Sequence, residues 1–418
     1  MLFREPCAFE RWDTGGGWPW WWQIGLVAGG AAAVARAARN ETYHALDVYT
    51  EAMTIIHNQY VDELPWSKIV QDGIRGAVEG LDADSTVVEA RKPAGAGDVG
   101  LLLTHRSGAL DVMATQDDSP ARAAGLAPGD RIVSIDRIEA RSLSVGDAAE
   151  RLQGAPGSQV ALSVFRAGWA EPRDFTLTRA KPPATAVRSR ALGAGVLYVR
   201  LPEITGRTPA DLQRSIGAAS GPVTGLVLDL RNTVGGDVRA VPAVASLFLD
   251  PGCVVARVQS RVAGQSAELT TSAGPARFTQ PVTILVGQGT ASAAEVLAAA
   301  MQDAKRAVIV GAPTFGDAST QSTTPLADGS RVSLTTSRYS TPGGRPITGH
   351  GVAPDVVASE PAPDAAPAAG TTASVADPAL QLALDVVKAA TILQPAAPEA
   401  AAPTRIQTTA PRCSVSPA

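Results

Sequence analysis

The longest apolar stretch of the chain runs from Trp18 to Ala35, and only Gln23 interrupts it. It is long enough to cross a bilayer as a helix. Four tryptophans crowd its first five positions, where an interfacial aromatic belt would lie. The pattern therefore favours a transmembrane anchor within residues 18–39, after an N-terminal tail of residues 1–17. The alternative is that this run forms a buried helix of a globular domain and has no membrane function.

A cleaved signal peptide is a further interpretation of this run. Small residues that suit a cleavage site stand at Ala33, Ala35 and Ala37. The preceding region suits a signal poorly, because acidic residues offset its arginines. Arg36 and Arg39 follow the run, and charge alone would keep the C-terminal part inside the cell. Cleavage and orientation both stay open.

Hydrophobic periodicity divides the rest of the chain into three regions. Helical spacing of apolar residues at 42–60 and 65–80 predicts a helical N-terminal region over residues 40–97. Short strands and two helices predict one small domain over residues 98–180. Strand and helix signals then alternate from residue 187 to residue 357, which indicates α/β layering.

The C-terminal part is rich in alanine and proline, so residues 361–418 are predicted to be a linker or tail. One helix, residues 378–390, is expected within it and is assigned to the preceding domain. The 418 residues allow several domains, and 45% hydrophobic content with 18% charge is globular. A net charge of -4 argues against nucleic acid as a partner. The cysteines form no metal or redox pair, and one disulfide, Cys253 to Cys413, stays open for an oxidising compartment.

The small domain has a sharp local pattern, SPARAAGLAPGDRIVSID at residues 119–136. Ser119 suits a helix cap, Pro120 the first helical position and Gly125 the helix end. A strand, a helix and a strand are predicted next, at 131–136, 144–153 and 159–166. This succession resembles a PDZ domain.

A PDZ domain adds a peptide as an extra strand beside an exposed sheet edge. The resemblance implies that backbone amides around Gly100 hold the terminal carboxylate, since glycine allows close backbone approach. A simple turn at Gly100 is the alternative. The apolar walls predict partners with free C-termini and apolar last residues. The implied peptide-binding residues are Val99, Gly100, Leu101, Leu102, Leu103, Val145 and Leu152.

Four segments carry a second resemblance: GLDADS at 80–85, GLVLDLRNTVGG at 225–236, GTASAAE at 289–295 and VGAPTFGD at 310–317. Their order and spacing resemble the C-terminal processing (tail-specific) serine peptidases. The resemblance implies an α/β (α+β) fold, with a crotonase-like core, an inserted PDZ domain and a helical N-terminal segment. It also implies hydrolysis of proteins near their C-termini, usually outside the bacterial cytoplasm, with no metal or organic cofactor.

Ser292 precedes a strong helix-forming run, where the helix dipole and unpaired amides suit an oxyanion hole. The same serine forms a capping-box pattern with Glu295, which needs no chemistry. By resemblance, Ser292 is the nucleophile. The amides at Gly235, Gly236 and Ala293 then stabilise the oxyanion.

The general base departs from the family pattern. The family places a lysine directly after Thr-Phe-Gly, and here that residue is Asp317. Gln321 matches the glutamine that orients this lysine. Lys305 lies in a stretch that is often basic in the family, and does not substitute easily. A carboxylate can accept a proton, but it adds negative charge beside a developing oxyanion.

Two functions therefore stay open. One is a serine endopeptidase whose hydrolysis is weakened or lost, and the other is a membrane-tethered PDZ scaffold that binds protein tails without cutting them. The expected location is the bacterial cell envelope, anchored in the inner membrane with the domains in the periplasm. A secreted or periplasmic protein, released after signal cleavage, is the alternative. The sequence defines neither the substrate nor the oligomeric state.

The apolar run predicts that the protein stays in the membrane pellet after alkaline carbonate extraction. Carbonate releases proteins bound at the membrane surface, whereas a helix inserted in the bilayer is retained. The measurement is the distribution between pellet and supernatant. Recovery in the supernatant, with an N-terminus between Arg36 and Arg39, would show cleavage instead.

Overall fold

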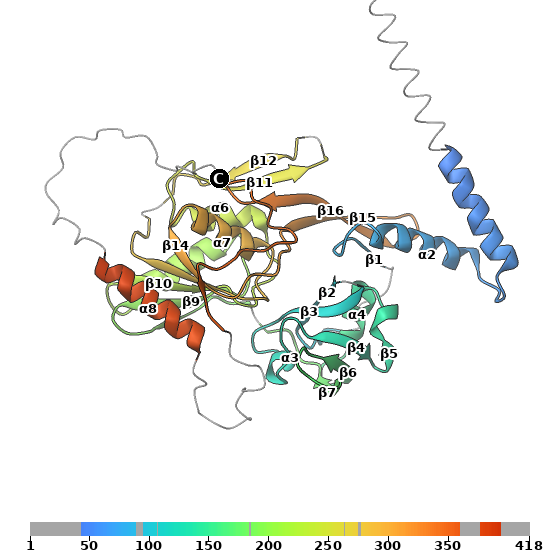
Figure 1. Cartoon of the computed structure of the whole chain (residues 1–418), viewed down its shortest axis with the longest axis horizontal. Coiled ribbons are helices and arrows are strands. Elements are labelled where there is room, and N and C mark those ends of the chain that lie inside the picture. Colours follow the sequence, from blue (N-terminus) through green and yellow to red (C-terminus); the bar gives the residue numbers. More distant parts are fainter. Residues whose placement is uncertain are drawn as a thin grey trace, which may run out of the picture. The chain divides into compact units, whose positions relative to one another are not determined.

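The computed structural model of the chain describes residues 43–88, 95–106, 108–183, 185–262, 264–274, 277–359 and 377–393 (Figure 1). The predicted anchor and most of the predicted tail lie outside these residues, as do Cys7 and Cys413. Cys253 is buried and disulfide-bonded. Within the described residues, no helix has the length and apolar character needed to cross a membrane. The chain divides into two compact units, residues 1–76 and 77–418.

The first unit is helical where the sequence predicts helices. Residues 43–59 are helical, and α2 spans Trp66–Glu79. The helices meet at Gly73, where a Cβ atom would overlap the side chains of Tyr49 and Met53. The absence of a side chain at Gly73 therefore allows the two helices to approach each other closely.

The small domain in the second unit is a β-sheet with two helices, as predicted. Its strand order is β2-β3-β4-β6-β7, with β5 paired to β4. Ser119 caps α3 and Ser144 caps α4, and apolar side chains of the sheet and both helices form one core. The elements are β2 Leu101–Arg106, β3 Ala109–Thr115, α3 Pro120–Ala123, β4 Arg131–Ile135, β5 Ile138–Glu139, α4 Val145–Leu152, β6 Gln159–Phe165 and β7 Arg173–Thr178.

The α/β layering expected over residues 187–357 is present as a sheet in the order β17-β14-β13-β10-β9-β8. Its strands run parallel, except that β8 runs antiparallel to β9. The strands are β8 Arg188–Ala191, β9 Val196–Arg200, β10 Gly225–Asp229, β13 Val282–Val286, β14 Ala307–Gly311 and β17 Val356–Val357.

Helices cover both faces of this sheet (Figure 1). Leu226 and Leu228 of β10 pack with α7 on one face, whereas Val227 packs with α8 on the other. The uninterrupted apolar pattern of β10 follows from burial on both sides. The helices are α5 Thr208–Gly217, α6 Val241–Ala245, α7 Ala293–Asp303 and α8 Pro378–Leu393, the last being the helix predicted at 378–390.

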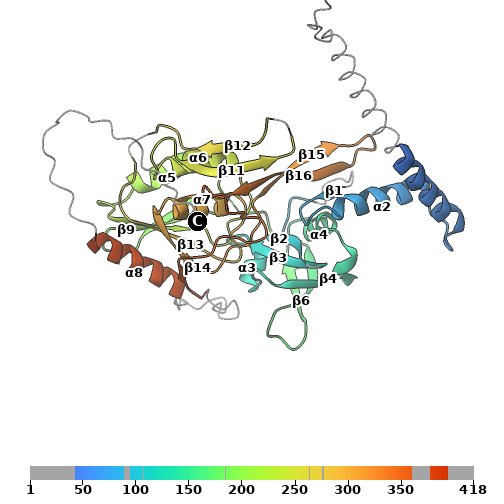
Figure 2. The same ribbon diagram turned by 45° about the horizontal axis from the view of Figure 1, so that its top comes forward.

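A third sheet contains a long hairpin of β15, Ser319–Pro325, and β16, Arg331–Ser340 (Figure 2). Strand β1, Thr86–Val88, pairs with β16, so that Thr86 lies opposite Ser333. At its C-terminal end, β16 pairs with β11, Val254–Ser260, and β11 pairs in turn with β12, Ala267–Thr270. The β1–β16 pairing brings the segment before the small domain to the start of β15.

Candidate functional site

Ser292 lies in the turn that leads into α7, in an uncommon backbone conformation with φ 58° and ψ -125°. Such a conformation costs an L-residue on the order of 1–3 kcal/mol and persists only where the surroundings enforce it. An ordinary N-cap residue has extended backbone geometry and needs no such strain. The capping-box contact from the Ser292 N–H to Glu295 Oε2, at 3.2 Å, is present, but helix capping alone does not account for the conformation.

Glu295 holds this turn against the loop that carries Asp317. Its fully buried carboxylate accepts the N–H groups of Ser292, Gly316 at 2.7 Å and Asp317 at 2.9 Å, and the hydroxyl of Thr314. Burial raises the pKa of Glu295 to about 7 despite these donors. The Ser292 N–H also donates to the Asp317 carbonyl at 2.7 Å. The sequence pattern indicated only a capping role for Glu295.

The predicted oxyanion loop lies next to the Ser292 turn. The Ala291 N–H donates to the Thr233 carbonyl at 2.9 Å and joins the two segments. Gly235 and Gly236 have φ values of 76° and 85°, and a Cβ atom at Gly236 would overlap the Ile204 carbonyl. In the described part of the chain, the amides of Gly235, Gly236 and Ala293 donate to no acceptor. Free, fixed amides of this kind suit a developing oxyanion.

Asp317 directs its carboxylate into a polar network. Its Oδ1 accepts the Ser319 hydroxyl at 2.7 Å, and the same hydroxyl lies 3.4 Å from Asp84 Oδ2. Gln321 Nε2 donates to Ser319 Oγ at 2.8 Å. The predicted orienting residue Gln321 is therefore bonded to Ser319 and not directly to Asp317. The sequence pattern indicated no role for Ser319 or Asp84, although Asp84 lies in the GLDADS segment.

The electrostatics of this network disfavour two ionised carboxylates. Burial raises the pKa of Asp84 to about 6, and the charges of Asp317 and Asp82 add to this effect. Burial also raises the pKa of Asp317. Arg338 lies 3.9 Å from the Asp82 carboxylate. Two coupled acids of this type titrate as a pair.

The small domain holds the predicted carboxylate loop in a defined conformation. Gly100 has φ 77°, and a Cβ atom there would overlap the Ser119 side chain. Both the backbone conformation and the lack of space therefore require glycine at this position. The Gly100 N–H donates to Asp98 Oδ1 at 2.6 Å. A peptide carboxylate would have to displace Asp98 to bind this amide.

The predicted groove residues divide into two groups. Val99, Leu101 and Leu152 belong to the buried core of the domain, and the half-buried Leu103 and Val145 pack against it. Leu102 is not part of this cluster. A cavity of about 360 Å³ lies at the Val145 end and is also lined by His105, Asp82 and Ser85. Of the predicted groove residues, only Val145 lines this cavity.

Comparison with known proteins supports both resemblances. Residues 195–358 match the model of peptidase family S41, and residues 112–166 match that of the PDZ domain. The carboxy-terminal-processing protease of Bartonella bacilliformis is 31% identical over 350 residues, covering 80% of each chain. The carboxyl-terminal-processing protease of Synechocystis is 36% identical over 257 residues, covering 60% of each. The solved photosystem II D1 C-terminal processing protease has a TM-score of 0.62 at 31% identity, over 77% of this chain and 94% of its own.

The raised pKa of Asp84 predicts a stability change in Asp84→Asn that depends on pH. An unfolded aspartate has a pKa of about 3.9, so between about pH 4 and pH 6 the folded wild type holds an extra proton and loses stability as the pH rises. The asparagine of the variant carries no charge, so thermal unfolding should give the variant a higher Tm than wild type at about pH 8. The difference should shrink at about pH 5.

The matched control is Asp385→Asn, which changes an exposed carboxylate on α8. It should show no such dependence on pH. Equal loss of stability in Asp84→Asn at both pH values would contradict the electrostatic account of this pair.

Proposed function

Because the chain belongs to the C-terminal processing serine peptidases of family S41, we propose that it binds protein C-termini through its PDZ domain while its hydrolytic step at Ser292 is weak or lost. The observation that carries the proposal is the side chain at position 317. Asp317 bonds to Ser319 and lies beside Asp84 in a network of acids. A serine hydroxyl needs a partner that takes its proton, and a lysine in that place would become a cation as the oxyanion forms. The acid pair supplies no such cation.

The remaining parts of the site support descent from an active peptidase. Ser292 keeps a strained turn that capping does not require, and the amides of Gly235, Gly236 and Ala293 are free to bind an oxyanion. Fixed amides stabilise the negative charge of a tetrahedral intermediate whichever group accepts the serine proton. Residual hydrolysis would therefore depend on Ser292 and the oxyanion loop. Complete loss would leave a PDZ scaffold that binds tails.

A carboxylate base is a second candidate, and one observation favours it. The raised pKa values of Asp84 and Asp317 make either carboxylate a stronger proton acceptor than an ordinary aspartate. The opposing effect is charge, because a carboxylate near the oxyanion disfavours the same intermediate that it helps to form. We give the greater weight to this repulsion.

The proposed location is the bacterial cell envelope, with residues 18–39 as an inner-membrane anchor and the domains in the periplasm. The support is the composition of that segment, and release after signal cleavage is the alternative. Carbonate extraction decides between the two.

The PDZ domain is predicted to bind a peptide that has an apolar last residue and a free carboxylate. Its C-terminally amidated twin should bind about tenfold or more weakly, because it lacks a charged acceptor for the backbone amides near Gly100. Titration by fluorescence anisotropy measures both affinities. Gly100→Ala should weaken the free-acid peptide, since its Cβ atom would meet Ser119. Equal affinities of the two peptides would rule out a carboxylate-binding loop.

Asp317→Lys is predicted to raise peptidase activity above wild type, because it restores a base that becomes a cation. The gain should be limited, since the Asp84 carboxylate would favour the protonated lysine and raise its pKa. Adding Asp84→Asn removes that partner and should raise activity further, by about tenfold or more, as part of the roughly 10²–10⁴-fold effect of general-base catalysis.

Cleavage of a reporter protein with an apolar C-terminus measures these rates. Adding Ser292→Ala to the double variant Asp317→Lys/Asp84→Asn should abolish the gain. Asp385→Lys, at an exposed position on α8, controls for the added positive charge. If neither Asp317→Lys nor Asp317→Lys/Asp84→Asn cleaved the reporter faster than wild type, the claim that only the base has been lost would be contradicted.

A further inference from the structure

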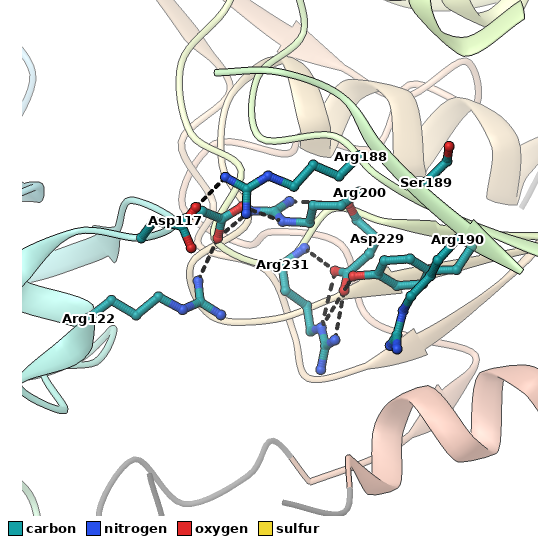
Figure 3. Close-up of a pocket in the computed structure, with 10 residues that line it drawn as sticks. Asp117, Arg122, Arg188, Ser189, Arg190, Arg200, Asp229 and Arg231 are labelled. Carbon is teal, nitrogen blue, oxygen red and sulfur yellow. Dashed lines mark hydrogen bonds and ion pairs between the residues drawn. The ribbon is translucent and has the colours of Figure 1, made fainter. Parts of the chain in front are cut away.

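A cavity of about 340 Å³ lies beside β8 and β9 and is rich in arginine (Figure 3). Residues of the loop before α3 and the ends of β9 and β10 complete its lining. The arginines of its wall are Arg122, Arg188, Arg190, Arg200 and Arg231. Asp117, Asp118 and Asp229 also line it, so the wall carries more arginines than carboxylates. A concave surface with an excess of one sign of charge attracts the opposite charge. An outside anion can bind only those arginines that the chain's own carboxylates do not hold.

Three of the arginines are held by the chain itself. Asp117 accepts from Arg122 at 2.8 Å and from Arg200 at 2.9 Å. Arg231 is bound at 2.7 Å by Asp229, which is fully buried. These contacts fix the wall of the cavity, and their partners are too well enclosed to be exchanged easily.

Arg188 and Arg190 differ from these three because both are exposed and neither is held by an enclosed carboxylate. Arg188 pairs with Asp118, but the side chains of this pair are 49% and 62% exposed, and such surface pairs contribute little. Arg190 lies over the Tyr198 ring at 5.0 Å and has no carboxylate partner in the described part of the chain. An outside carboxylate can therefore bind Arg190 directly and exchange with Asp118 at Arg188.

The spacing of these two arginines matches an extended peptide. They are two residues apart on β8, which places them on one face about 7 Å apart. Alternate side chains of an extended peptide have the same separation. β8 also ends the order of its sheet, and all its residues are exposed. A sheet edge of this kind can take a peptide as an added strand.

We propose that β8 forms a subsite for an extended acidic segment of a protein, whose carboxylates at alternate positions bind Arg188 and Arg190. The inference rests on the proposed peptide-binding function and deepens it, because it names acidic segments as part of what the protein recognises. It requires neither hydrolysis nor the carboxylate loop of the PDZ domain.

The test uses the full-length protein carrying Ser292→Ala, so that no peptide is cut. Two labelled peptides of alternating threonine and glutamate, or threonine and glutamine, are acetylated and amidated at their ends, which leaves no terminal carboxylate for the PDZ domain. The glutamate peptide should bind about tenfold or more tightly by anisotropy, with an affinity that falls as salt rises.

Arg190→Ser should weaken the glutamate peptide by about tenfold, since it removes one charge-assisted pair and disrupts no internal ion pair. The matched control, Arg214→Ser, changes an arginine that is 75% exposed on α5 and does not line the cavity, and it should leave binding unchanged. Equal binding of the two peptides, or wild-type affinity in Arg190→Ser, would overturn the proposal. Either result leaves the free-carboxylate test of the PDZ domain unaffected.

Discussion

The geometry of the Ser292 site depends on one buried carboxylate, that of Glu295. It joins the N–H of Ser292 to the N–H groups of Gly316 and Asp317, so the turn and the loop move as one piece. Burying a charge is costly unless donors satisfy it, and these donors come from backbone whose conformation is thereby fixed. The backbone N–H and carbonyl of residue 317 are held by Glu295 and Ser292, and these contacts do not involve the side chain of residue 317. A change from lysine to aspartate can therefore alter the chemistry of the site while leaving its frame in place.

The fold brings a second acid, Asp84, to the same place as Asp317. Asp84 precedes β1, and the pairing of β1 with β16 carries it to the start of β15, where Ser319 and Asp317 lie. Burial raises the pKa values of both acids. Where the family places a neutral lysine poised to gain a proton, this chain has an acid pair that resists further negative charge. In the proposed account, the loop at Gly235 and Gly236 keeps free amides that suit an oxyanion, whereas the acid pair supplies no base that becomes a cation.

Sequence patterns predicted the elements that are defined locally. The helix cap at Ser119 and the helix that begins near Ser144 follow from residue order alone. The contacts that were missed depend on long-range register. Nothing in the sequence places Asp84 beside Ser319, because that contact requires β1 to pair with β16. Asp98, which bonds the Gly100 amide, was also overlooked, since a side chain returning to its own loop leaves no periodic signal.

The central claim is that Asp317 does not activate Ser292, and the rate of covalent labelling of Ser292 tests it most directly. A fluorophosphonate reports the nucleophilicity of the serine without requiring a natural substrate. The full-length wild type and Asp317→Asn are labelled in parallel, with Ser292→Ala as the blank. The account predicts equally slow labelling of both, because the aspartate contributes no useful proton transfer. Rapid labelling of the wild type that is lost in Asp317→Asn would contradict it and make Asp317 a working base.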